Sequence, residues 1–323
     1  MANGNEPRAC TEYRPLRKTD APQLAEVWRL QGAQRGLMQP MSTSVLERYV
    51  FSKPYFDAQG LIVAVDENTV VGFAHAGFGP NADESALSTD EGVTCVVMLR
   101  PQTDPAIGQT LLARCEDYLR SRGAQALRGG ACFPLAPFYY GLYGGSELSG
   151  VLTSDVQTQA LFREAGYDEH NRSIVMRRDL AQFRPVVDRQ QLQIRRHHTI
   201  ETITDPPTRT WWEACMFEPF DRTICFLMPR GGRQPAAHVL FWNMETMLGT
   251  WGVRAAGIAD VEVSADRQRQ GLARYLLGEA LRHVHSQGVS IAEVHVPCEN
   301  EPAMAVFQSL GFEAVDEAIH FAK

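Results

Sequence analysis

Residues 266–277 read DRQRQGLARYLL, in which a polar stretch meets a single glycine and then an apolar pattern. The segment before it, GIADVEVS at residues 257–264, alternates apolar and polar residues as a half-buried strand does. After Gly271 the apolar residues recur at helical spacing, at Leu272, Leu276, Ala280 and Val284. The stretch therefore predicts a strand, a tight polar turn and a helix.

This turn has features of an anion site. A helix N-terminus presents unpaired backbone N–H groups and the positive end of the helix dipole. Gly271 leaves room where an anion would approach, and Ala273 is the next smallest residue. The side chains of Gln268, Arg269 and Gln270 add further donors. Two interpretations stay open for the turn alone, an anion site or a plain structural turn, because no known nucleotide phosphate-loop pattern is present.

The bulk properties exclude several classes of protein. A chain of 323 residues exceeds what one hydrophobic core usually serves, so we expect two domains. A net charge of −7 and a pI near 5.7 argue against a nucleic-acid partner. No long uninterrupted apolar stretch and no signal pattern occur, so we expect no membrane partner and a cytoplasmic location. Seven cysteines without a Cys-x-x-Cys pair predict neither a disulfide framework nor a metal site.

The same order of elements occurs twice along the chain. Each half begins with a β-like segment and helical residues, continues with a hairpin and a further strand, and reaches a helix ended by glycine. A strand, a short helix and a last strand close each half. The β-like start of the second half is QLQIRRHHTIETI, residues 191–203. We predict an N-terminal domain at residues 1–186 and a C-terminal domain at residues 187–323, joined by the polar linker 181–190.

The string from Val261 to Phe312 resembles the GNAT superfamily of acyl-CoA-dependent N-acetyltransferases. The family's pyrophosphate turn, [RQ]-x-x-G-x-[GA], stands here as Gln268-Arg269-Gln270-Gly271-Leu272-Ala273. Its later segment, Asn-x-x-Ala followed by Tyr and Gly-Phe, stands here as Asn300 to Ala303 with Phe307 and Gly311-Phe312. The resemblance implies an α/β (α+β mixed sheet) fold of two tandem GNAT domains. Each domain would be a mostly antiparallel mixed sheet flanked by helices.

The first half matches this plan more loosely. Its turn, residues 103–109, contains Asp104, which brings a negative charge, and Pro105, which lacks an N–H donor. Both changes oppose anion binding. We therefore expect a GNAT fold with a degenerate cofactor site in the N-terminal domain, and an active site in the C-terminal domain.

The resemblance also implies roles for individual residues toward acetyl-CoA. The backbone of Val261 and Val263 would bind the pantetheine arm as an added strand, and Asn300 would reach the same arm. The amides from residue 269 to Arg274 would hold the pyrophosphate. The family's frequent general acid is a tyrosine at the position of Phe307, and phenylalanine has no proton to give.

Asp260 and Glu262 alternate onto one strand face, and either one is a candidate for the catalytic base. Ordinary solvated or ion-paired carboxylates are the alternative. The acceptor implied is a primary amine of a small molecule or peptide, and the protein would be a monomer or a homodimer. Two other functions remain open: a non-catalytic acyl-CoA-binding regulatory module, and aminoacyl transfer on a tandem GNAT fold.

Three aromatic features carry two interpretations each. The tryptophans at 211, 212, 242 and 251 would line an acceptor pocket or pack in a core. An aromatic and glycine-rich insert, residues 131–152, would cover a ligand or an interface. His320 would face the acceptor cleft of the second half or serve in packing.

Overall fold

The computed structural model describes residues 11–32, 34–185 and 187–323. The predicted domain border between 186 and 187 therefore falls partly outside the described residues, as does Cys10. The strands are β1 (Glu12–Pro15), β2 (Leu61–Asp66), β3 (Thr69–Pro80), β4 (Leu87–Leu99), β5 (Ala126–Gly129), β6 (Val151–Leu152), β7 (Asp168–Asp179), β8 (His198–Thr204), β9 (Arg222–Pro229), β10 (Ala237–Asn243), β11 (Ala255–Val263), β12 (Ile291–Pro297) and β13 (Glu313–Ala322). The α-helices are α1 (Ala21–Arg29), α2 (Thr43–Leu46), α3 (Pro105–Ser121), α4 (Val156–Glu164), α5 (Arg189–His197), α6 (Trp211–Phe217), α7 (Leu248–Trp251), α8 (Leu272–Ser286) and α9 (Glu301–Ser309).

The predicted order of elements is present in both halves, with one correction. Residues 191–197 were expected to be β-like, but they belong to helix α5, and strand β8 starts only at His198. The carboxylate of Asp188 accepts from the N–H of Gln191 (2.8 Å) and caps the helix. Gln191 and Ile194 share one face of the helix and are buried. This cap and the spacing of the buried residues make the segment helical.

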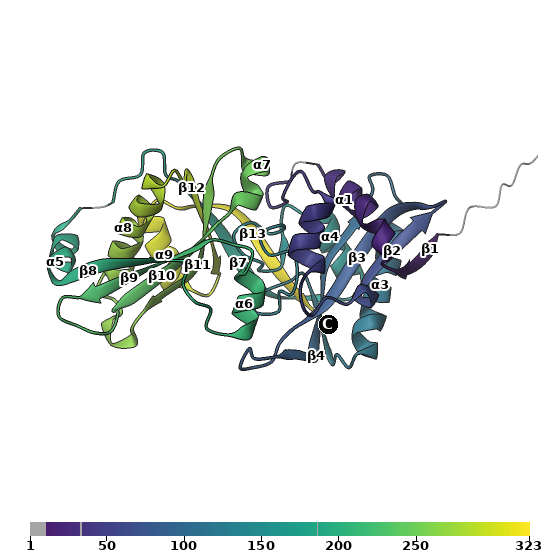
Figure 1. Cartoon of the computed structure of the whole chain (residues 1–323), viewed down its shortest axis with the longest axis horizontal. Coiled ribbons are helices and arrows are strands. Elements are labelled where there is room, and N and C mark those ends of the chain that lie inside the picture. The colour runs from purple at the N-terminus through teal and green to yellow at the C-terminus, as the bar shows by residue number, and fades with distance from the viewer. Residues whose placement is uncertain (1–10, 33, 186) are drawn as a thin grey trace, which may run out of the picture.

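All strands join one continuous mixed sheet, whose strand order is β1-β2-β3-β4-β5-β13-β7-β12-β11-β10-β9-β8. β7, the last strand of the first half, pairs with β12 of the second half. β13, the last strand of the second half, pairs with β5 and β6 of the first half as well as with β7. Figure 1 shows the yellow β13 running into the lobe of the first half, where the chain ends. The two halves have exchanged their last strands.

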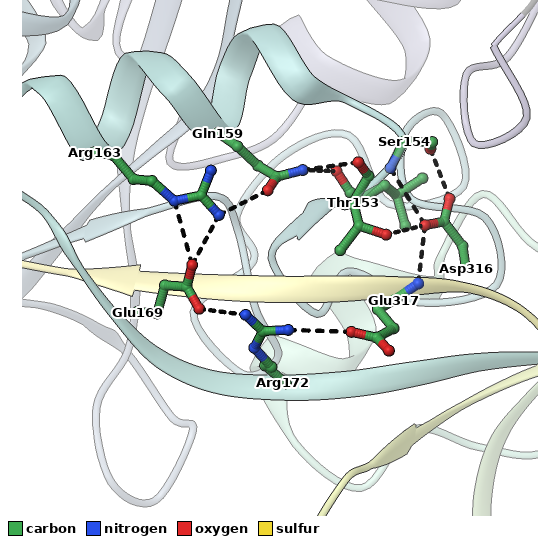
Figure 2. A network of polar contacts seen from close by, with 9 residues as sticks. Thr153, Ser154, Gln159, Arg163, Glu169, Arg172, Asp316 and Glu317 are labelled. Carbon is green, nitrogen blue, oxygen red and sulfur yellow. Dashed lines mark hydrogen bonds and ion pairs between the residues drawn. The ribbon is translucent and has the colours of Figure 1, made fainter.

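A polar network fixes the exchanged strand β13 to the first half (Figure 2). The carboxylate of Asp316 accepts from the hydroxyls of Thr153 (2.7 Å) and Ser154 (2.6 Å), both next to β6. Glu317 forms an ion pair with Arg172 of β7 (3.2 Å). Hydroxyls and guanidinium groups of the first half thus hold the carboxylates of the second.

The insert, residues 131–152, lies between the halves. Its Tyr140 contacts Phe217, Phe220 and Trp242 of the second half, with ring centroids 5.0 to 5.7 Å apart. These rings belong to one apolar cluster that also contains Trp28 and Leu24 of α1. Of the four grouped tryptophans, Trp212 and Trp242 are buried in this cluster. The interface interpretation of the insert and the core interpretation of these two tryptophans are confirmed.

The sheet has two differently covered faces. Helices α3 and α4 pack on one face of the first half, and α8 and α9 pack on the same face of the second. The insert, α1 and α6 cover the opposite face, which we call the insert face. Within the described ranges, no helix is both long enough and apolar enough to cross a bilayer.

Candidate functional site

The predicted strand, turn and helix are β11, residues 264–271 and α8. β11 pairs in parallel with β12 only from Ala255 to Gly257, after which the two strands separate. Arg269 (φ 59°) and Gly271 (φ 79°) both have left-handed backbone conformations, and Gly271 is the N-cap of α8. Within the described residues, none of the backbone N–H groups from 268 to 274 has a protein acceptor. The turn therefore presents a set of unpaired donors at a helix N-terminus, which favours a bound anion.

The corresponding turn of the first half is closed by its own side chain. The Asp104 carboxylate caps α3 by accepting from the N–H of Ala106 (3.0 Å), and the Asp104 carbonyl accepts from Ile107 (2.9 Å). Pro105 contributes no donor. The N–H groups of Ala106 and Ile107 are therefore already used, and the loss of the phosphate site in this half stays a prediction.

Two side chains lie against the turn of the second half. The amide of Gln190 donates to the carbonyl of Gln270 (3.1 Å). The atoms of the same amide lie 2.9 to 3.0 Å from the position that a Cβ on Gly271 would take. Arg274, expected at the pyrophosphate, forms a long ion pair with Asp188 (3.5 Å). Both contacts are partly exposed and come from the start of α5, so a ligand competes only with weak surface interactions.

A β-bulge turns the two predicted catalytic carboxylates to the insert face. Ala259 is the extra residue of β11, because Leu240 pairs with Asp260 and the next residue of β10 pairs with Ile258. Ile258 and Val261 contact the α8 core, whereas Asp260 and Glu262 point to the opposite side. Bulges often aim side chains at sites in this way.

Asp260 is already paired. Its carboxylate lies 2.9 Å from Nε2 of His238, and the guanidinium of Arg209 is 3.9 Å away. The hydrogen bond from His238, partly opposed by burial, lowers the pKa of Asp260 below its usual value. Glu262 is mostly exposed and lies 3.8 Å from Nδ1 of His238. His238, which sequence reasoning did not select, links the two.

The first half lacks these groups at the equivalent positions. Its own bulge is at Cys95, because His75 pairs with Val96 and the next residue pairs with Thr94. Counting from the two bulges, the positions of His238, Asp260 and Glu262 are taken by Phe73, Val96 and Met98. All three replacements are apolar and buried, so the first half has no carboxylate at these positions, and its bulge carries a buried histidine, His75, instead.

The first half nevertheless keeps an open groove. A cavity of about 640 Å³ lies between the end of β4, the start of α3 and the start of α4. Cys95, Gly108 and Ser154 are among its lining residues. It occupies the place where β4 and β5 separate beyond Thr94. Asp104 caps the turn of this half, whereas the adjoining groove is open.

β12 adds two buried polar groups to the insert face, Glu293 and His295. Glu293 is fully buried and forms ion pairs with Arg35 (3.1 Å) and Arg177 (2.9 Å). Nδ1 of His295 hydrogen-bonds the hydroxyl of Ser149. The sequence signal for these residues is the alternation IAEVHVP, which places both on one strand face.

The remaining predicted residues have structural roles. Asn300 is the N-cap of α9 and accepts from the N–H of Ala303 (3.1 Å). Phe307 is buried and packs against Phe312, with ring centroids 5.1 Å apart. Leu272 is buried under α8. It stays a prediction that these residues contact a cofactor, and the same holds for Val261, Val263 and residues 268–274.

His320 does not face the cleft of the second half. β13 carries it into the first half, where it lies beside His170 and lines a cavity of about 410 Å³ that also includes Arg128. The prediction that placed His320 at the acceptor cleft is wrong because the strand exchange moves it. The described part of the chain contains no group of His, Cys, Asp and Glu residues arranged to hold a metal.

Comparisons with known proteins agree with this geometry. Residues 190–312 match the model of the acetyltransferase (GNAT) family. The chain is 36% identical over 63 residues to a mycothiol acetyltransferase of Saccharomonospora viridis, covering 20% of this chain and 21% of that protein. It is 29% identical over 145 residues to a mycothiol acetyltransferase of Catenulispora acidiphila, covering 41% and 43%. The matches thus span less than half the length of these relatives.

Solved structures resemble nearly the whole chain. A tandem GNAT protein from the clavulanic acid biosynthesis pathway has a TM-score of 0.67 at 14% identity, covering 97% of this chain and 98% of that one. A GCN5-related N-acetyltransferase from Sphaerobacter thermophilus has a TM-score of 0.63 at 16% identity, covering 97% and 95%. The chain therefore has the fold of tandem GNAT proteins, and its residues 190–312 match the model of that family.

Proposed function

We propose that the protein is an N-acetyltransferase that moves acetyl from acetyl-CoA to a primary amine of a small molecule or peptide, and that its active site lies in the C-terminal half. The observation that carries this proposal is the set of unpaired N–H groups from residue 268 to 274, next to the open edge of β11. Asp260 and Glu262 at the bulge, whose equivalents in the first half are apolar, support the same location. So does the family match over residues 190–312.

The residues fit acetyl-CoA, which would supply an acetyl group on a thioester. The N–H groups of the turn would bind its pyrophosphate together with the positive end of the α8 dipole. Beyond Gly257 the edge of β11 that faces β12 has no strand partner within the described chain, so the backbone of Val261 and Val263 is available to the pantetheine arm. Asn300 lies at the neighbouring end of α9.

The proton chemistry belongs to the carboxylates of the insert face. An acceptor amine is an ammonium ion at neutral pH, and a carboxylate must remove its proton before the nitrogen attacks the thioester. Phe307 gives no proton and is buried. The leaving thiolate would therefore take its proton from water, which is adequate for a thiol with a pKa near ~8.5, by analogy with cysteine.

Isothermal titration calorimetry with acetyl-CoA tests the binding site and its location. Gly271→Glu places a carboxylate at the unpaired donors, and we expect at least a tenfold loss of affinity. Ala106→Glu is the matched variant in the first half, two positions after Asp104, and should bind as the wild type does. Circular dichroism checks that both variants are folded. Absence of binding, or loss of binding only in Ala106→Glu, would overturn the proposal.

A second candidate function is a non-catalytic acyl-CoA-binding module. The lack of a proton donor at Phe307 and the open groove of the first half favour it. The discriminating measurement is thiol release from acetyl-CoA in the presence of primary amines, because a binding module releases no CoA. Aminoacyl transfer from charged tRNA is a third candidate, and the net charge of −7 argues against it.

A further inference from the structure

The insert of the first half is anchored on β12 of the second half. The backbone N–H of Ser146 donates to Oε1 of Glu293 (2.9 Å), and the hydroxyl of Ser149 hydrogen-bonds Nδ1 of His295. Both β12 residues face the insert, at the place where β11 and β12 begin to separate. Glu147 lies between the two anchored serines. Its backbone is therefore held over the proposed active site of the other half.

A third contact fixes the same segment from the side of β10. The indole N–H of Trp242 donates to the carbonyl of Ser146 (3.0 Å), and Trp242 is buried. The hydroxyl of Tyr140 donates to the same carbonyl (3.2 Å). Contacts from β10 and β12 thus hold the backbone on either side of Glu147 in place.

The carboxyl of Glu147 is surrounded by titratable groups of the site. His295 of β12 and Asp260 of β11 interact with it electrostatically. The charge of Glu147 in turn helps to raise the pKa of Tyr140 and of Cys132 in the insert. Burial raises the pKa of Glu147 to about 7, the negative charge of Asp260 adds to this, and His295 partly offsets it. A pKa near the working pH is the value that suits a general base.

Two of the other carboxylates on this face are bound to basic side chains, and a third, Glu262, is mostly exposed. Asp260 is bound to His238 at 2.9 Å, and Glu293 is bound to Arg177 at 2.9 Å. The carboxylate of Glu147 has no hydrogen bond or ion pair with any described residue. Glu147 as a whole residue is partly exposed. Among Asp260, Glu293 and Glu147, only Glu147 has no partner in the described residues and is free to take a proton.

We propose that Glu147 is the catalytic base, so that the insert of the first half completes the active site of the second half. This inference rests on the proposed function. The Glu147 carboxylate takes one proton from the acceptor ammonium, and the freed nitrogen forms a bond to the thioester carbon. The carbon–sulfur bond breaks, the electron pair leaves on sulfur, and the second nitrogen proton passes through water to the thiolate. Asp260, with His238, is then a positioning residue that keeps a fixed negative charge near Glu147.

The first experiment measures the proton affinity of Glu147 directly. The full-length protein is labelled with carbon-13 at glutamate side-chain carboxyls, and its spectrum is followed from pH 5 to pH 9. We expect one resonance to titrate near pH 7 and to be absent from Glu147→Gln. Absence of any resonance with both properties would overturn the inference.

The second experiment measures CoA thiol release with acetyl-CoA and three amine probes, which are glucosamine, lysine amide and a tripeptide with a free amino terminus. Glu147→Gln should lose about 100-fold or more in kcat/KM on a probe that the wild type accepts, which is the usual contribution of a general base. The inflection near pH 7 should also be lost. Glu147→Asp, which keeps the carboxylate, should lose less than tenfold. Glu313→Gln, an exposed glutamate on β13, is the control.

An acceptor that needs no base separates proton removal from a structural effect. Methoxyamine is already deprotonated at neutral pH, so Glu147→Gln should lose less than tenfold on it. A loss of 100-fold on methoxyamine as well would overturn the catalytic role. If the wild type releases CoA and the rate of Glu147→Gln is within threefold of it, the inference alone is overturned and the proposed function stands. No release by the wild type with any probe would overturn the proposed function, and the inference with it.

Discussion

Replacing Glu293 by glutamine should weaken the joint between the two halves. Its fully buried carboxylate on β12 binds Arg35 of the loop after α1 (3.1 Å) and Arg177 of the exchanged strand β7 (2.9 Å), and it accepts from the backbone of the insert at Ser146 (2.9 Å). One ionised group therefore joins three separate segments of the first half to the second. Glutamine keeps the shape of the side chain but removes its charge.

The magnitude follows from the pKa of the carboxyl. Burial raises the pKa of Glu293, but the interaction with His295, 3.9 Å away, and the charges of Arg35 and Arg177 outweigh it and lower the pKa from 4.5 to about 2. Each pKa unit corresponds to about 1.4 kcal/mol, so ionised Glu293 contributes about 3 kcal/mol. Because the folded-state pKa is lowered, this stability is fully present above pH 4.5. It is lost progressively as the pH falls toward 2.

Denaturant unfolding followed by tryptophan fluorescence and circular dichroism measures the effect. At pH 7 we expect Glu293→Gln to lower the free energy of unfolding by about 3 kcal/mol. At pH 3 the difference from the wild type should shrink to about half, because the wild-type carboxylate is then losing its advantage. Glu313→Gln, on an exposed part of β13, should change the stability by less than ~0.5 kcal/mol. A loss below ~1 kcal/mol at pH 7, or a difference that does not change with pH, would refute the reasoning.

Three further predictions concern the joint between the halves. When the two halves are produced as separate chains, 1–186 and 187–323, each should aggregate, because each half needs the other's last strand. Production of both chains together should give one complex on size exclusion. A folded monomer of the second chain alone would contradict this. Asp316→Ala should lower the unfolding free energy by about 2 kcal/mol, since it deprives two hydroxyls and two backbone N–H groups of their acceptor. An unchanged denaturation midpoint would show that the network carries no stability. Trp242→Phe should cost about 1 kcal/mol through loss of the indole donor to Ser146, and thermal unfolding equal to the wild type would argue against that bond.

Features that depend on neighbouring residues were predictable from the sequence. The helix after Gly271, the hairpin of β2 and β3 and the end of α8 follow from periodicity, turn residues and glycine positions, which act over a few residues. The same reasoning located the unpaired donors of the turn, because a helix N-terminus always leaves them. It failed at residues 191–197, where the cap at Asp188 competes with a weak strand pattern and makes the segment helical.

The pairing of distant strands could not be predicted in this way. The alternation of apolar and polar residues in β7 and β13 would fit the sheet edge of either half. The sequence pattern therefore does not distinguish a strand kept by its own half from a strand exchanged with the other half. That choice moved His320 into the first half, and contacts between the halves hold the backbone on either side of Glu147 against β12 and Trp242 of the second.

The sequence by itself determined that the chain contains two copies of one order of elements, and that the turn ending at Gly271 is suited to an anion. Only the tertiary structure decided which strands belong together, which half carries two carboxylates at its bulge, and that the carboxylate of Glu147 has no partner among the described residues. The physical reason is that turns and caps are set by local backbone chemistry. The proton affinity and the availability of a side chain are set instead by burial and by charges far away in the chain.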